Sequence, residues 1–280
     1  MRFLHRPKRE TSTTYRRPLT VAAPSAWSET LEALYPPACW LCADGLESGW
    51  FCSNHSLPQG APAPCCRVCA LELPTGLRGG STCGPCRREP PAWEQLVSLG
   101  DYHRERGLRA GILALKHGGR RDLCLPLGRA LARRLEECVH VSGVDLFVPV
   151  PLHPLRHLQR GHDQALGLAR SVAAVLDRPV RRSLRRLRPT PAQGTACSES
   201  LWAALLGRGR RGHSRAANVS GAFALEEREA RHVTGRRVWL VDDVVTSGHT
   251  VRECSVLLKR AGADSVGVLC LARASLSGHA

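Results

Sequence analysis

The sequence has no long hydrophobic run and no apolar segment at its start. None of its apolar stretches reaches the roughly 18 residues that a membrane-spanning helix requires. The first residues, MRFLHRPKRETSTTYRRP, lack the apolar core of a secretory signal. We therefore expect a cytoplasmic protein without a membrane-inserted segment. Residues 1–35 are predicted to be a disordered basic tail, with an organelle transit peptide or a start codon assigned too early as alternatives.

Aromatic residues are scarce, at 5% of the 280 residues, although hydrophobic residues make up 43% and suffice for a packed core. The net charge of +16 is unevenly distributed, with +5 in residues 1–27 and +9 in residues 178–215. We expect an anionic partner, either nucleic acid or a phosphorylated small molecule, to meet these two segments. Because few aromatic side chains are available for base stacking, contact with single-stranded DNA would depend mainly on arginine and phosphate.

Eight of the thirteen cysteines lie between Cys39 and Cys86. Without a secretion signal a disulfide framework is not expected, and clustered cysteines indicate metal instead. Four pairs separated by two residues predict two four-ligand zinc sites that leave no position open for water, so the zinc would be structural. The predicted ligands are Cys39, Cys42, Cys52 and His55 for one ion, and Cys66, Cys69, Cys83 and Cys86 for the other.

The spacing alone leaves part of this assignment open. A cross-braced arrangement, in which the first pair shares its ion with the third, has the same spacing. His55 is the weakest of the predicted ligands, and Cys65 is a neighbour that could replace Cys66. Residues 36–90 contain few apolar side chains, so this predicted double zinc ribbon would need its ions in order to fold.

Strand-like and helix-like patterns alternate between residues 95 and 275. Strands are expected at 96–102, 144–152, 236–243 and 264–273, and helices at 106–116, 123–138, 162–177 and 250–260. Asp163 is the expected N-cap of the third helix, and Gly262 is expected to end the fourth. The alternation predicts an α/β domain with a largely parallel sheet and flanking helices. The arginine-rich stretch 178–221 is expected to be mostly loop.

The stretch VWLVDDVVTSGHTVRE, residues 238–253, predicts the ligand site. Ligands of parallel sheets bind at the carboxyl ends of the strands, where Asp242 and Asp243 would lie. The following loop, Thr246-Ser247-Gly248-His249-Thr250, leads into a helix whose first N–H groups favour an anion. Two carboxylates beside a phosphate cradle suit a ribose 5-phosphate. The nucleoside-triphosphatase motif GxxxxGK[ST] is absent, and a phospho-acceptor receiver domain gives the TSGHT loop no role.

These motifs carry a family resemblance. The stretch VDDVVTSGHT resembles the phosphoribosyl-diphosphate signature of type I phosphoribosyltransferases. Residues 36–275 resemble the ComF competence family, on the evidence of CWLC, CRREPPAW, VPVPLHPLRHLQRGHDQA, RPTPAQ and RAANVSGAF. The resemblance implies a phosphoribosyltransferase-like protein that binds phosphoribosyl diphosphate with Mg²⁺, transfers the phosphoribosyl group to an unidentified acceptor, and contributes to DNA uptake alongside other competence proteins.

The resemblance also implies roles for individual residues. Asp242 and Asp243 would bind the ribose and Thr246 to Thr250 the 5-phosphate, and Val241 would belong to the same ligand-binding stretch. Pro149, Val150 and Pro151 would contact pyrophosphate, whose charge Lys116, Arg160 and Arg215 would neutralise together with Mg²⁺. The residues of a hood over the ligand would be Arg188, Gln193, Arg215 and Asn218.

Two features depart from the family pattern. The chain has His162 and Asp163 where the family usually has Phe and Asn, and it carries an insertion between Gln193 and Arg215. A carboxylate at 163 would repel pyrophosphate unless it binds magnesium or caps the helix. The alternative function is a non-catalytic single-stranded DNA-binding module that uses the zinc ribbons and the arginine-rich loop.

Overall fold

The computed structural model describes residues 38–46, 50–58, 64–73, 81–152, 161–188 and 221–274. The predicted basic tail lies outside the described residues, as do Arg160, Gln193, Arg215 and Asn218.

The centre of the fold is a four-stranded sheet. Its order is β1 (Gln95–Asp101), β6 (Ser265–Arg273), β5 (Arg237–Val245) and β2 (Leu146–Pro149), and every neighbouring pair is parallel. The prediction of a parallel α/β sheet is therefore confirmed. β5 extends two residues past its expected end, to Val245, because its ladder with β6 continues through the two aspartates. β2 is shorter than expected at both of its ends.

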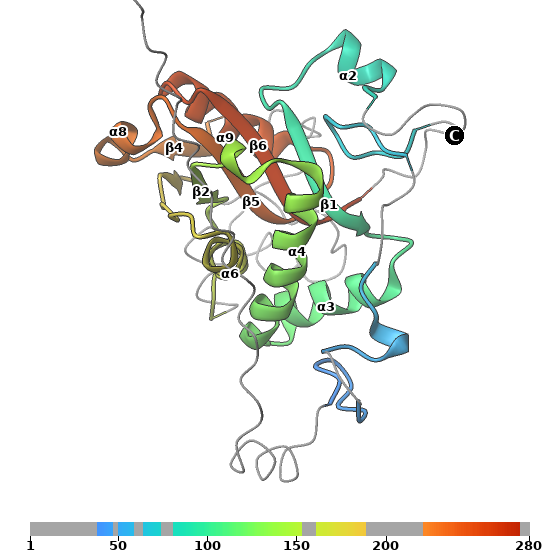
Figure 1. Cartoon of the computed structure of the whole chain (residues 1–280). Coiled ribbons are helices and arrows are strands. Elements are labelled where there is room, and N and C mark those ends of the chain that lie inside the picture. Colours follow the sequence, from blue (N-terminus) through green and yellow to red (C-terminus); the bar gives the residue numbers. More distant parts are fainter. Residues whose placement is uncertain are drawn as a thin grey trace, which may run out of the picture.

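Helices cover both faces of this sheet (Figure 1). α3 (Arg106–His117), α4 (Cys124–Cys138) and α6 (Gln164–Leu176) share one apolar core with one face. α9 (His249–Arg260) packs in a second core on the other. In the described part of the chain no helix is both long and apolar enough to cross a bilayer.

The alternation of side chains along β5 decides where the two aspartates point. Trp239 and Val241 belong to the core of the three helices, whereas Val238 and Leu240 belong to the core of α9. Because successive side chains of a strand face opposite sides, Asp242 continues toward the α9 side and Asp243 toward the side of α3, α4 and α6. Asp242 and Asp243 thus point to opposite faces of the sheet.

The arginine-rich stretch is not all loop. Within it lies β3 (Leu184–Arg186), which pairs antiparallel with β4 (Phe223–Leu225). A three-residue strand with one buried side chain has too little alternation to be recognised, and its partner is distant in sequence. Glu253 of α9 fixes this small sheet, since its Oε1 accepts hydrogen bonds from the backbone N–H of Ala222 (2.9 Å) and Phe223 (3.3 Å).

Short elements complete the described chain. They are η1 (Ser53–His55), α2 (Gly84–Arg88), η2 (Arg121–Leu123), η3 (Val141–Gly143), η4 (Glu227–Glu229) and α8 (Ala230–Val233). The cysteine-rich segments contact the sheet domain at several points. Segment 50–58 lies beside α3 (Figure 1), where a Cβ at Gly107 would come within 2.5 Å of the Ser56 carbonyl oxygen. Segment 64–73 meets β1, and Leu96 N–H donates to the Arg67 carbonyl oxygen at 3.0 Å.

Candidate functional site

A hollow opens where β5 ends and α9 begins. It is lined by residues 244–251 together with Asp242, and it opens to solvent with a cavity volume of about 40 Å³. That volume is far smaller than the pockets that take drug-sized ligands, and it leaves room for one small polar group such as a phosphate. The predicted phosphate loop, residues 246–250, therefore lies against a cavity, with Asp242 on its rim.

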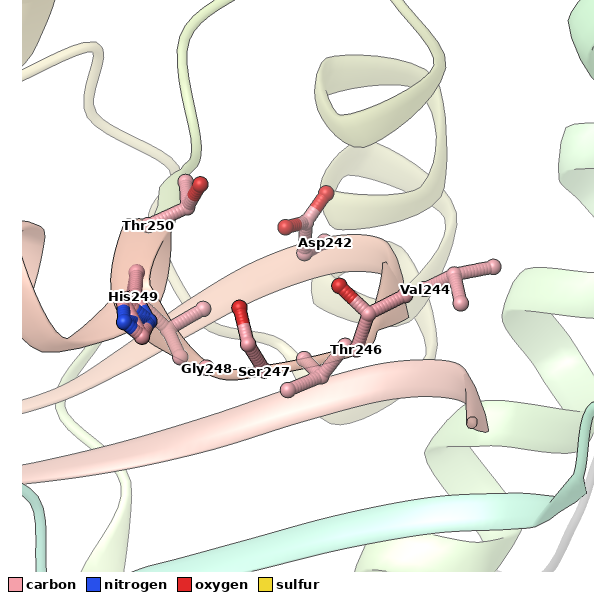
Figure 2. A pocket seen from close by; sticks show the side chains of 9 residues that line it. Asp242, Val244, Thr246, Ser247, Gly248, His249 and Thr250 are labelled. Atoms are coloured by element: carbon pink, nitrogen blue, oxygen red, sulfur yellow. The ribbon is translucent and has the colours of Figure 1, made fainter. Parts of the chain in front are cut away.

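The loop offers hydrogen-bond donors to an anion. Gly248 is the N-cap of α9 and has φ +79°, a left-handed conformation that glycine adopts without strain. The first N–H groups of an α-helix have no intrahelical partner, and the helix dipole is positive at that end. Figure 2 shows the Asp242, Thr246 and Ser247 oxygens pointing into the same space. The Ser247 hydroxyl oxygen is buried, and within the described residues it has no hydrogen-bond partner.

Asp242 carries a perturbed carboxyl group. Desolvation by the surrounding protein, and then the negative charge of Asp243, raise its pKa to about 7. The Asp243 backbone N–H donates to Asp242 Oδ1 at 2.8 Å and opposes part of this rise. The carboxyl is therefore divided between its protonated and ionised forms near neutral pH, and hydroxyl donors of a ligand would favour the ionised form.

Asp243 faces away from the loop and pairs with a lysine. Lys116, near the end of α3, places Nζ 3.1 Å from Asp243 Oδ1, and the two side chains are 21% and 14% exposed. The structure thus brings together two residues separately predicted to act at the site. The Lys116–Asp243 pair lies on the face of the sheet opposite to the loop. The carboxylates of Asp242 and Asp243 therefore do not point to the same side of the sheet.

The proline turn after β2 lies beside these acids. The Cα of Pro149 pairs with that of Val241, and the Val150 N–H donates to the Val241 carbonyl oxygen at 2.9 Å. Val150 is buried, whereas Pro151 is partly exposed. The carboxyl ends of β2 and β5 therefore form one edge that carries the predicted ligand residues of 149–151 and 241–243, and the loop 246–250 follows directly from it.

The two substituted residues, Asp163 and His162, have structural roles, whereas the insertion between Gln193 and Arg215 lies outside the described residues. The Asp163 carboxylate accepts a hydrogen bond from the Leu166 N–H at 3.0 Å and caps α6, as expected. Its charge is thus placed where the helix dipole favours it. His162 is 7% exposed and belongs to the interior instead of the ligand surface.

The predicted metal ligands form two separate clusters. In each, the four ligand atoms lie within 4.8 Å of one another; the groups are Cys39, Cys42, Cys52 and His55, and Cys66, Cys69, Cys83 and Cys86. This sequential grouping is the predicted one and differs from a cross-braced pairing. Thiolate and imidazole donors at this separation suit tetrahedral zinc, so each cluster could hold one ion.

Two residues near the loop were not predicted from the sequence. The Trp93 ring packs against Gly248, and Arg273 donates hydrogen bonds to the carbonyl oxygens of Val245 and Thr246. Trp93 stands in the CRREPPAW motif, which gave it no role, and Arg273 is only the last residue of an expected strand. The periodicity of the segments that contain Trp93 and Arg273 gives no information about their contacts with residues 245–248.

Comparison with known proteins agrees with this architecture. Residues 121–278 match the family described as the phosphoribosyl transferase domain. The DNA utilization protein YhgH of Escherichia coli K12 is 33% identical over 247 residues, which cover 85% of this chain and 97% of that protein. Competence protein F of Haemophilus influenzae is 30% identical over 215 residues, covering 75% of this chain and 85% of that protein.

Among solved structures, the glutamine phosphoribosylpyrophosphate amidotransferase of Bacillus subtilis, complexed with ADP and GMP, aligns with a TM-score of 0.31 at 22% identity. The alignment covers 59% of this chain and 27% of that one.

Proposed function

Since this chain belongs to the phosphoribosyl transferase domain family and is related to the DNA utilization proteins and competence protein F, we propose that it binds phosphoribosyl diphosphate with Mg²⁺. The binding site is the carboxyl edge of β5 and β2. The observation that carries the proposal is the phosphate loop itself. The buried Ser247 hydroxyl, which has no hydrogen-bond partner in the part of the chain that the structure describes, lies beside the N-terminus of α9 and lines the same hollow as Asp242.

The proposed arrangement gives each group one task. The 5-phosphate occupies the hollow of residues 246–250 and receives hydrogen bonds from the loop and the start of α9. Asp242 accepts hydrogen bonds from the ribose hydroxyls next to it. The pyrophosphate end extends toward the Pro149–Pro151 turn and toward Lys116. There it would compete with Asp243 for the ammonium group that now lies 3.1 Å from that carboxylate.

Transfer would follow from this arrangement. Breaking the bond between C1 of the ribose and pyrophosphate places negative charge on the leaving group, which Lys116 is placed to stabilise. Bound Mg²⁺ would supply further positive charge at the same end. The described residues contain no motif for binding a nucleobase in addition to the proposed phosphoribosyl-diphosphate site, so the acceptor is not assigned. We propose a pentosyltransferase reaction with the acceptor left open.

The direct test is isothermal titration of the zinc-loaded chain with phosphoribosyl diphosphate in the presence of Mg²⁺. The proposal expects one ligand per chain and weaker heats with ribose 5-phosphate or pyrophosphate, each of which satisfies only part of the site. Absence of heat with all three would end the proposal. Release of pyrophosphate on addition of candidate acceptors would then distinguish transfer from binding alone.

A second candidate function is contact with single-stranded DNA. It is supported by the names of the relatives, which refer to DNA utilization and competence, and by the +9 charge of residues 178–215. Arginine–phosphate binding loses affinity steeply with salt because counterions are released. Fluorescence anisotropy with a labelled oligonucleotide at two salt concentrations tests this, and an affinity independent of salt would count against it.

A further inference from the structure

One knuckle of the second cysteine cluster, residues 66–69, is linked to the phosphate loop by two separate side chains. The first is Arg273, the last residue of β6, whose Nε donates to the Cys69 carbonyl oxygen at 3.0 Å. Its Nη1 donates to the Val245 carbonyl oxygen at 2.8 Å and to that of Thr246. A single guanidinium thus connects the backbone of a metal-ligand residue to the backbone where β5 becomes the loop.

The second link is Trp93, which precedes β1 and is 7% exposed. Its indole Nε1 donates to the Val68 carbonyl oxygen at 2.6 Å, inside the same knuckle. The other end of the ring lies under the loop, because a Cβ added to Gly248 would be 3.3 Å from Trp93 Cη2. The Arg252 guanidinium lies over the ring with its Cζ 6.0 Å from the centroid, so the indole is enclosed between knuckle and helix.

The knuckle depends on its ligand set for its shape. The buried apolar cluster of this segment consists of Cys66, Val68, Cys69 and Leu73, two of which are predicted ligands. So small a core stabilises little by itself, and metal binding supplies folding free energy in such modules. If the knuckle opens, the carbonyl groups of Val68 and Cys69 no longer hold Trp93 and Arg273, and both links to the loop are lost.

We propose that Arg273 and Trp93 are positioning residues through which metal at the Cys66–Cys86 cluster orders the phosphate loop. The chain would then bind its anionic ligand well only when this cluster is loaded. The identity of that ligand rests on the function proposed above, whereas the ordering of the loop does not. Because coupling between two binding sites is reciprocal, the ligand would also slow the loss of metal from this cluster.

The experiment is hydrogen exchange of the backbone amides of residues 246–250 in the zinc-loaded full chain, measured without ligand. Cys86→Ser weakens the second cluster, and Arg273→Ala removes one link while leaving all eight ligands in place. We expect loop exchange to become about tenfold faster in both variants. Arg273→Ala should retain the zinc content of the wild type, which shows that the loop can be released without loss of metal.

Three controls accompany these variants. Cys42→Ser weakens the first cluster and should leave loop exchange unchanged, and Arg260→Ala removes an exposed arginine of α9 with the same expectation. Amides of β6 residues 266–271 report whether the sheet itself remains folded. If the β6 amides of a variant also exchange fast, that variant is replaced by Arg273→Lys or Trp93→Phe, which keep most of the packing. In these replacements we expect a smaller acceleration of exchange at the loop amides 246–250.

The outcomes separate this proposal from the function. Loop exchange that is equally slow in wild type, Cys86→Ser and Arg273→Ala overturns the coupling, whatever the ligand is. Faster exchange in Cys42→Ser by the same amount also overturns it, because the effect would not be specific to the second cluster. A wild-type chain that shows the coupling but binds no phosphoribosyl diphosphate would contradict only the proposed function.

Discussion

Lys116 Nζ lies 3.1 Å from Asp243 Oδ1, and the pair joins the end of α3 to the carboxyl end of β5. Both side chains are mostly enclosed, so removing one partner leaves a poorly solvated charge. We expect Lys116→Met to lower the free energy of unfolding by about 1–2 kcal/mol, between the values for exposed and buried pairs.

The double variant Lys116→Met, Asp243→Asn is the matched control for this prediction. It removes both charges, so the free energy of unfolding should return toward the wild-type value while affinity for phosphoribosyl diphosphate stays low. Urea unfolding and titration calorimetry measure the two quantities on the same samples. Full affinity in the single variant would remove Lys116 from the ligand site.

The raised pKa of Asp242 predicts a pH dependence of stability. The native state holds its proton up to about pH 7, whereas the unfolded chain releases it near pH 3.8, so ionisation costs stability as the pH rises through this window. Asp242→Asn should therefore raise the free energy of unfolding by about 2 kcal/mol at pH 8, after allowance for the partial exposure of the site. The gain should shrink below pH 5. A gain independent of pH would contradict the assignment.

Gly248 combines a left-handed backbone with contact to Trp93. Gly248→Ala would have to keep φ +79° and also displace the ring 3.3 Å away. We expect a loss of about 1 kcal/mol in stability from the backbone and roughly tenfold weaker ligand binding from the moved loop. Gly235→Ala is the matched control, because Gly235 has φ +68° with nothing within 4 Å of an added Cβ. Equal binding losses in the two variants would argue against a special role of the loop.

The two cysteine clusters predict metal content. Native mass spectrometry of the full chain should find two zinc ions, and Cys42→Ser and Cys83→Ser should each lose one. A chelator should release both ions and lower the melting temperature, since metal binding is coupled to folding in small modules. A chain that keeps its melting temperature without zinc would show that the clusters are not structural metal sites.

Local patterns in the sequence predicted the strands, the helices and the eight metal ligands, because these depend on periodicity and spacing, whereas the spacing left the choice between sequential and cross-braced grouping open. The N-cap Asp163 and the loop after Asp243 follow from residues adjacent in sequence. Two features could not be predicted in this way. β3 is too short to show a period, and the contacts of Trp93 with Gly248 and of Arg273 with Cys69 join residues more than a hundred positions apart. The opposite orientation of Asp242 and Asp243 follows from the alternation of a strand that was expected to contain both, although the predicted ribose contacts did not take it into account. The predicted domain boundaries, which divide the chain into residues 1–35, 36–90 and 95–275, stay predictions.

The carboxyl edge of β5 is the proposed binding site of phosphoribosyl diphosphate. Titration calorimetry of Asp242→Ala, Asp243→Ala with that ligand and Mg²⁺, beside the wild type, tests this site. Loss of the charge-assisted hydrogen bonds from Asp242 to the ribose should weaken binding at least about a hundredfold, so that the heat disappears at ligand concentrations that saturate the wild type. Unchanged heat in a folded, zinc-loaded variant would show that this edge of β5 does not hold the ligand.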